Sequence, residues 1–162
     1  MSQDFNGLRE LYQEVIFDHN RSPRNFEVIE NASHFANGHN PLCGDQLAVY
    51  AVVEDGIVQK VSFVGHGCAI SKASASLMTE AVKGLSLAEF ESLFQDMHAM
   101  LTEAHPDRDL GKLEVLSGVR EFPARVKCAT LAWHTLHNAI NQEPQRSDLR
   151  LKLMEVQAEL GD

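Results

Sequence analysis

Two β-rich runs separated by a tight turn constrain the fold of this chain more than any other feature. Residues 47–53 and 57–64 are rich in β-branched and aromatic side chains, and Asp55 and Gly56 lie between them. An Asp-Gly pair flanked by such runs is a strong signal for a two-residue hairpin turn. The sequence therefore predicts an antiparallel hairpin here, with a short edge strand near residues 33–36 as its neighbour.

Helical patterns surround this hairpin. Apolar residues recur at helical spacing in residues 8–19 and 124–140, and a run rich in small residues follows Cys68. Ser86 and Glu89 form a capping-box pattern at the start of another helix. The order of helix, strands and helices predicts an α+β fold, in which a small antiparallel sheet of about three strands packs against helices.

Length and charge limit the possible partners. A chain of 162 residues suits one domain, and its 14 Lys and Arg against 23 Asp and Glu give a net charge of −9. A chain with this net negative charge is not expected to bind the phosphate backbone of a nucleic acid. No apolar run approaches the roughly 20 residues that span a bilayer, and the N-terminal residues do not resemble a secretory signal. We therefore expect a cytoplasmic protein that binds neither nucleic acid nor membrane.

The three cysteines, Cys43, Cys68 and Cys128, each lie at the boundary of a predicted element. An odd number of cysteines in a cytoplasmic chain favours metal binding or thiol chemistry over disulfides. Asp45 follows Cys43 with only Gly44 between them, and three thiolates with one carboxylate make a set that tetrahedral zinc accepts. By spacing alone, the simpler interpretation is that Asp45 stabilises a turn, because no paired Cys-x-x-Cys motif is present.

Two basic residues flank the third cysteine. Arg125 lies one helical turn before Cys128 and can reach the same helix face, where it would stabilise a thiolate or a persulfide. For Lys127, a place on a solvated helix face is at least as good an interpretation as contact with a thiolate or a persulfide. The eight histidines form no recognisable metal motif, and we assign none of them to a site.

Three motifs occur in order along the chain: residues 40–45 (NPLCGD), 65–76 (GHGCAISKASAS) and 125–133 (RVKCATLAW). Together they resemble the IscU/NifU-type iron–sulfur cluster assembly family, and within it the SufU branch, over about residues 6–141. Lys127 stands where IscU proteins carry a histidine before the third cysteine. The segment between the second and third cysteines is also longer than in IscU, and both features resemble SufU.

The resemblance implies a compact domain with a three-stranded antiparallel sheet in residues 1–141, and a helical C-terminal extension in residues 142–162. It implies zinc held by Cys43, Asp45, Cys68 and Cys128. Cys43 would accept persulfide sulfur from a pyridoxal-phosphate-dependent, SufS-type cysteine desulfurase, after a side chain of that partner displaces it from zinc. Arg125 would contact the sulfur or the partner. A SufBCD-type scaffold or apo iron–sulfur proteins would be further partners.

On the main interpretation, the protein is a sulfurtransferase-like acceptor that works with a desulfurase, not an independent turnover enzyme. Several alternatives remain open from the sequence. It could instead be a scaffold that holds a labile [2Fe–2S] cluster on Cys43, Cys68 and Cys128. A structural zinc module for protein binding, a cysteine hydrolase with a distant histidine, and three inert thiols without metal are the remaining interpretations.

Overall fold

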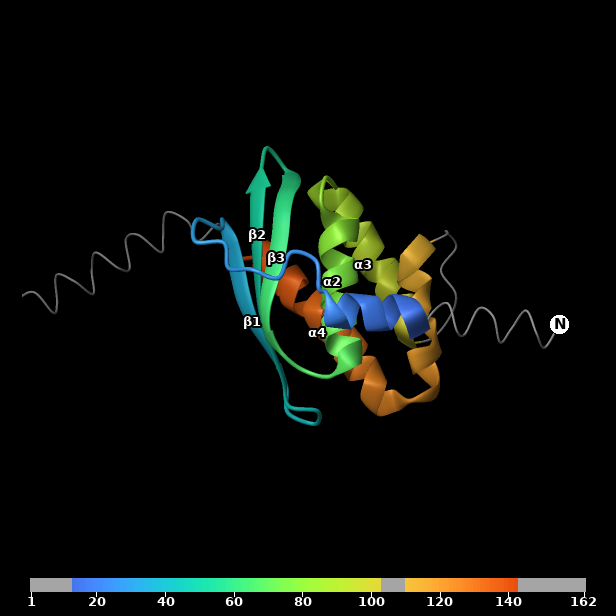
Figure 1. Cartoon of the computed structure of the whole chain (residues 1–162). Coiled ribbons are helices and arrows are strands. Elements are labelled where there is room, and N and C mark those ends of the chain that lie inside the picture. Colours follow the sequence, from blue (N-terminus) through green and yellow to red (C-terminus); the bar gives the residue numbers. More distant parts are fainter. Residues whose placement is uncertain (1–12, 103–109, 143–162) are drawn as a thin grey trace, which may run out of the picture.

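The helices and strands follow each other in the order that the sequence predicts. The structure is a computed structural model that describes residues 13–102 and 110–142, and residues 13–21 form its first helix. The further elements are β1 (His34–Asn40), β2 (Asp45–Glu54), β3 (Ile57–His66), α2 (Ala69–Val82), α3 (Leu87–Thr102), the 3₁₀ helix η1 (Gly111–Glu121) and α4 (Pro123–Ile140), as Figure 1 shows.

The three strands form one antiparallel sheet in the order β1-β2-β3, which confirms the predicted fold class. The predicted hairpin is the pair of β2 and β3. Its turn residues Asp55 and Gly56 both have positive φ angles, 54° and 74°, as a type I′ turn requires. β1 extends beyond the predicted residues 33–36 because it pairs with β2 as far as Asn40, which lies opposite Asp45.

The far end of β3 also differs from the sequence-based expectation. The glycines of residues 65–67 favour a flexible turn from the sequence alone, but the first two of these residues continue β3 opposite Leu47 and Gln46. Gly65 makes this pairing possible, because it has a φ of +138° and a Cβ there would lie 2.1 Å from the carbonyl oxygen of Gln46. The two strands therefore stay paired almost to Cys68.

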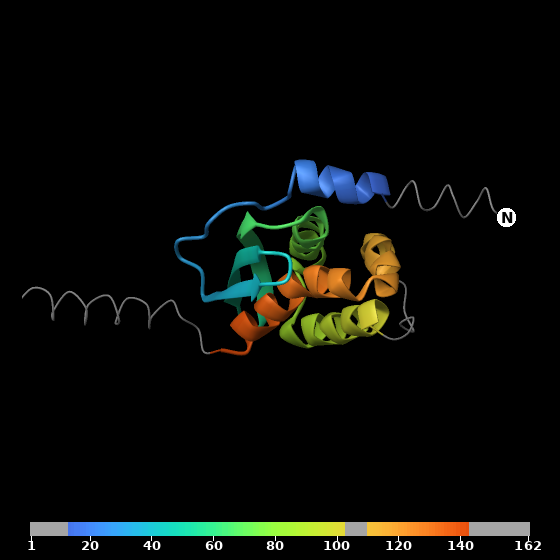
Figure 2. The ribbon, with the colours of Figure 1, turned by 90° about the horizontal axis from the view of Figure 1, so that it is seen from below.

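The elements form layers. α4 packs on β1 and β2, and α2 packs on β3, so that these two helices cover one face of the sheet. α3 and η1 pack on α4 from the side away from the sheet (Figures 1 and 2). The largest fully buried side chains of the resulting core are Trp133, Phe63, Phe90, Met78 and Met97. Burial of this apolar surface provides the main driving force for folding.

Small and hydroxyl-bearing side chains let α2 and α4 approach each other closely. Ser74 of α2 is fully buried, and its Oγ donates to the carbonyl oxygen of Ala129 in α4 at 2.6 Å. The same Oγ accepts a hydrogen bond from Trp133 Nε1 at 3.2 Å. These buried polar groups are therefore paired across the interface, as their burial requires.

Local sequence signals mark several of the helix ends. The first helix ends at residue 21, just before Ser22 and Pro23. In the capping box before α3, Glu89 accepts from the Ser86 N–H at 2.9 Å and donates its own N–H to Ser86 Oγ at 3.1 Å. Pro123 occupies the first turn of α4. The His-Pro-Asp run at 105–107, which is typical of a loop, and the predicted helix in 142–162 fall almost wholly outside the described residues.

None of the described helices is long and apolar enough to span a membrane.

We expect Gly38→Ala to lower the free energy of unfolding by about 1–3 kcal/mol. A Cβ on Gly38 would lie 2.0 Å from Thr135 Oγ1, so α4 would have to move away from β1. Chemical unfolding followed by circular dichroism measures the change. Gly118→Ala is the matched control, because a Cβ there meets nothing within 4 Å. An equal effect of both substitutions would contradict the close contact at Gly38.

We expect His19 to make the protein less stable in mild acid. The first helix runs alongside α2 (Figure 2), and His19 on it is buried, with its Nδ1 2.7 Å from Ser76 Oγ. Burial lowers the pKa of its imidazole, and the charge of Arg24 acts in the same direction. The unfolded chain therefore binds the proton first, so this contribution to stability is complete above the ordinary pKa of about 6.5 and is lost as the pH falls through the folded pKa.

Urea unfolding at about pH 7.5 and about pH 5.5 tests this expectation. The loss of stability on acidification should be smaller in His19→Gln than in the unmodified protein. His39→Gln, which changes an exposed histidine of β1, should leave the loss unchanged. Identical losses in all three proteins would show that His19 does not contribute.

Candidate metal centre

The loop between β1 and β2 carries the first candidate ligand. Residues 41–44 form this loop, and it closes on the paired residues Asn40 and Asp45. Gly44 has a φ of +73°, and the N–H of Leu42 donates to Asn40 Oδ1 at 3.3 Å. Cys43 therefore lies at a sharp turn, half-buried, on a segment that belongs to neither strand.

The second candidate ligand lies on the core face of the sheet. Asp45, Leu47 and Val49 alternate with more exposed residues along β2, and the side chain of Asp45 is fully buried. Its Oδ1 accepts a hydrogen bond from the backbone N–H of Cys68 at 2.9 Å. Its Oδ2 lies 3.5 Å from Asn40 Nδ2. The carboxylate thus connects the ends of β1, β2 and α2.

Cys68 is the N-cap of α2. Its Sγ accepts from the N–H of Ser71 at 3.4 Å, and the thiol is half-buried. The sequence-based placement of Cys68 at the start of a helix is confirmed.

Cys128 lies in the second turn of α4 and is fully buried. Its Sγ donates to Cys43 Sγ at 3.0 Å, across 85 positions of sequence. Burial raises the pKa of the Cys128 thiol, and hydrogen bonds with Cys43, Cys68 and Asp45 raise it further. Without a cation nearby, this thiol therefore stays protonated.

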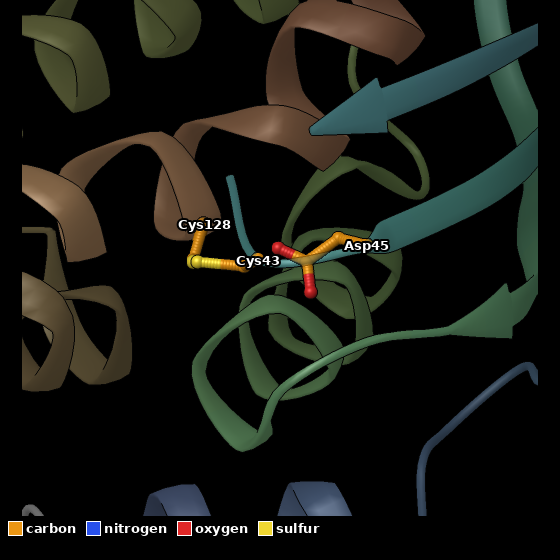
Figure 3. Close-up of side chains that lie close together, drawn as sticks. All are labelled: Cys43, Asp45 and Cys128. Atoms are coloured by element: carbon orange, nitrogen blue, oxygen red, sulfur yellow. The ribbon is translucent and has the colours of Figure 1, made fainter. Parts of the chain in front are cut away.

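The fold brings three of the four predicted ligands into one cluster. The ligand atoms of Cys43, Asp45 and Cys128 lie within 4.8 Å of one another (Figure 3). Cys68 is not a member of this cluster, because its Sγ caps α2, although its backbone contacts Asp45 and its thiol interacts with Cys128. A four-ligand site would need the Cys68 side chain to turn from the helix end toward the cluster.

The chemistry of the donors fits a thiophilic cation such as zinc. The Asp45 carboxylate is fully buried, and it pairs with no Lys, Arg or His side chain in residues 13–102 and 110–142. An ionised carboxylate in such a place needs a compensating positive charge. Three thiols and one carboxylate could hold a zinc ion, which accepts this tetrahedral set.

Within the described residues, the side chains of the two basic residues that flank the third cysteine form no hydrogen bond or ion pair with this cluster. Arg125 and Lys127 are exposed, and the guanidinium of Arg125 has no hydrogen-bond or ion-pair partner among the described residues. Asn40, by contrast, contacts the site, and this role was not predicted from the sequence. Its place in the first motif, directly before the loop that leads to Cys43, is the feature of the sequence that could have indicated the role.

The chain belongs to the NifU-like N-terminal domain family, whose model matches residues 11–148. It is 42% identical over 140 residues to the zinc-dependent sulfurtransferase SufU of Bacillus subtilis, covering 84% of this chain and 93% of that protein. It is 38% identical over 133 residues to the iron–sulfur cluster assembly scaffold protein IscU of Thermotoga maritima, covering 82% of this chain and 94% of that protein.

A solved structure shares the fold. It is that of a candidate iron–sulfur cluster assembly scaffold protein for the SUF system, from Fervidobacterium islandicum AW-1. The TM-score is 0.76 at 33% identity, over 79% of this chain and 95% of that chain. The family resemblance that the three motifs indicated is therefore confirmed.

We expect Gly67→Ala to weaken zinc binding about 10- to 100-fold without removing any ligand atom. A Cβ on Gly67 would lie 2.6 Å from Asp45 Oδ1, so the carboxylate would have to move. Competition with a chromogenic chelator measures the affinity. Gly118→Ala is the control with open space around its Cβ. An unchanged affinity in Gly67→Ala would show that Asp45 does not need its present position.

Proposed function

We propose that this protein serves iron–sulfur cluster assembly in the cytoplasm as a zinc-bound sulfur acceptor, which takes persulfide sulfur from a SufS-type cysteine desulfurase on Cys43. The proposed zinc ligands are Cys43, Asp45, Cys68 and Cys128. The SufU relative, at 42% identity, carries the zinc-dependent sulfurtransferase function in its name. SufBCD-type scaffolds or apo iron–sulfur proteins are the proposed receivers of the sulfur or cluster.

The contrast between Cys43 and its neighbours is the main support for this proposal. Asp45 and Cys128 are fully buried within β2 and α4, and moving either would disturb a regular element. Cys43 is half-buried in the loop of residues 41–44. It can therefore leave the cluster by a loop movement alone, while the other donors stay where the fold holds them.

The transfer itself is a thiol exchange. The Cys43 thiolate attacks the terminal sulfur of the persulfide on the desulfurase cysteine. The bond between the two sulfurs of that persulfide breaks, a new S–S bond forms on Cys43, and the desulfurase cysteine leaves as a thiolate. No external oxidant or reductant is needed, because the sulfane sulfur only changes its carrier.

Zinc, when bound, keeps the thiols deprotonated and protects them from oxidation. The residues of the chain decide where the exchange occurs. The fully buried Cys128 and Asp45 are closed to a large partner, whereas the loop residue Cys43 is accessible to one.

The surface next to the loop is suited to a protein partner. Leu42, directly before Cys43, is 67% exposed, and Phe122, at the start of the helix that carries Cys128, is 60% exposed. Exposed apolar side chains beside a reactive group favour a docking contact. Arg125 is exposed in the same first turns of α4, and we propose that it contacts the incoming sulfur or the partner.

A scaffold for a labile [2Fe–2S] cluster is the second candidate function. The similarity to the IscU scaffold of Thermotoga maritima favours it, because three thiols and a carboxylate could also hold such a cluster. Cys43, Cys68 and Cys128 would be its ligands. We further propose that residues 1–141 are the functional domain and that residues 142–162 are an accessory extension.

We expect zinc-loaded protein to stimulate cysteine turnover by a SufS-type desulfurase at least about 10-fold more than Cys43→Ser does, because the variant lacks the accepting thiolate. Alanine production measures the turnover. Mass spectrometry of the Cys43 peptide should show the added mass of one sulfur atom after the reaction. The exposed-site variant His39→Gln is the control and should behave like the unmodified protein.

Other outcomes would favour other functions. Equal stimulation by Cys43→Ser, with a change in stability only, would leave a structural zinc module. Anaerobically purified protein that is brown, contains iron and sulfide, and passes both to an apo-ferredoxin would favour the scaffold.

A further inference from the structure

Asn40 is the buried polar residue that connects the parts of the metal centre. It ends β1 and is 5% exposed. Its Nδ2 lies 3.5 Å from Asp45 Oδ2 and 3.7 Å from Cys128 Sγ, and its Oδ1 accepts the N–H of Leu42 at 3.3 Å. One amide group therefore contacts a carboxylate, a thiol and the loop, and its contacts with Asp45 and Leu42 are longer than the usual range of about 2.7–3.2 Å for an N–H···O hydrogen bond.

We propose that Asn40 is a positioning residue that decides which ligand leaves the metal, because it holds Asp45 and Cys128 in place and leaves Cys43 as the ligand that exchanges. The inference rests on the proposed function of Cys43 as the sulfur acceptor. It adds the reason why Cys43, and not the thiol of Cys128, is released.

The hydrogen bonds at the site are unequal in the way this proposal requires. A deprotonated thiolate and a carboxylate both gain from an N–H donor, and bonds to charged acceptors are about twice as strong as neutral ones. Asn40 supplies such a donor to Cys128 and Asp45. Asp45 receives a second donor from the N–H of Cys68.

Cys43 lacks this support. The hydrogen bond at its Sγ comes from the thiol of Cys128, and no other described residue donates to it. That bond is lost when Cys128 is deprotonated by a metal. The thiolate of Cys43 is then held by the metal alone, which makes it the ligand that a competing side chain displaces most readily.

The side-chain amide oxygen Oδ1 of Asn40 sets where the loop can move. It fixes the N–H of Leu42, so the loop is tied to β1 one residue before Cys43. After Cys43 comes Gly44, whose φ of +73° is accessible to glycine at little cost. Cys43 can therefore swing out between a fixed residue and a flexible one, without moving Asp45.

The substitution Asn40→Asp removes the amide nitrogen and adds a negative charge in its place. The aspartate keeps an oxygen for the Leu42 N–H, but it replaces the Nδ2 donor with a second acceptor that faces Asp45 and Cys128. Asn37→Asp is the matched control, because it makes the same change in charge on an exposed position of the same strand. Asn40→Ala removes the donor without adding charge, and it also removes the acceptor for the Leu42 N–H.

The zinc-loaded proteins are treated with a limiting amount of iodoacetamide, and the modified cysteines are identified by peptide mass spectrometry. Zinc release to a chromogenic chelator is followed in parallel. We expect the unmodified protein and Asn37→Asp to be alkylated first at Cys43. In Asn40→Asp and Asn40→Ala the preference for Cys43 over Cys128 should fall, and zinc should leave about 10-fold faster.

A purely structural role for Asn40 would lower the unfolding temperature and leave the order of alkylation unchanged, and this result would overturn the proposal. Equal zinc release from Asn40→Asp and Asn37→Asp would also overturn it. If Asn40→Asp does not fold, Asn40→Ala decides by the same two measurements. Failure of the unmodified protein to stimulate a desulfurase would reject the proposed function, whereas the order of alkylation would still report on Asn40.

Discussion

A buried carboxylate without a basic partner is the constraint on which the rest of this structure depends. Asp45 lies on the core face of the sheet, and among the described residues its contacts are an amide, a backbone N–H and thiols. A charge in this position requires a cation, and the fold supplies thiols where that cation would lie. The cysteines come from a loop, a helix N-terminus and a helix, so a bound metal would join three separate parts of the chain.

The sequence predicted most of the fold because its signals were local. The Asp-Gly turn and the capping box before α3 each depend on a few adjacent residues, and both are confirmed. The full length of β1 and the continuation of β3 through Gly65 depend on pairing with β2. Such pairing is long-range information that no local pattern contains.

The candidate site was predictable in its membership and less so in its geometry. The motifs identified the three cysteines and Asp45, but spacing could not show that Cys68 would point toward the end of its own helix. Asn40 escaped notice because an asparagine beside a proline is ordinary in a turn. Its importance arises only when β1 places its amide between Asp45 and Cys128, which are 83 positions apart in the sequence (128 − 45).

The closing pair of the β1–β2 hairpin has a consequence for insertions and deletions. Asn40 lies directly opposite Asp45, and residues 41–44 span the gap between them. Side chains alternate between the two faces of a strand, so a shift of one residue would turn Asp45 from the core to the solvent. The length of this loop is therefore as strict a requirement of the site as the identity of its ligands. A chain with every ligand retained and one residue added here would lose the centre by a change of register alone.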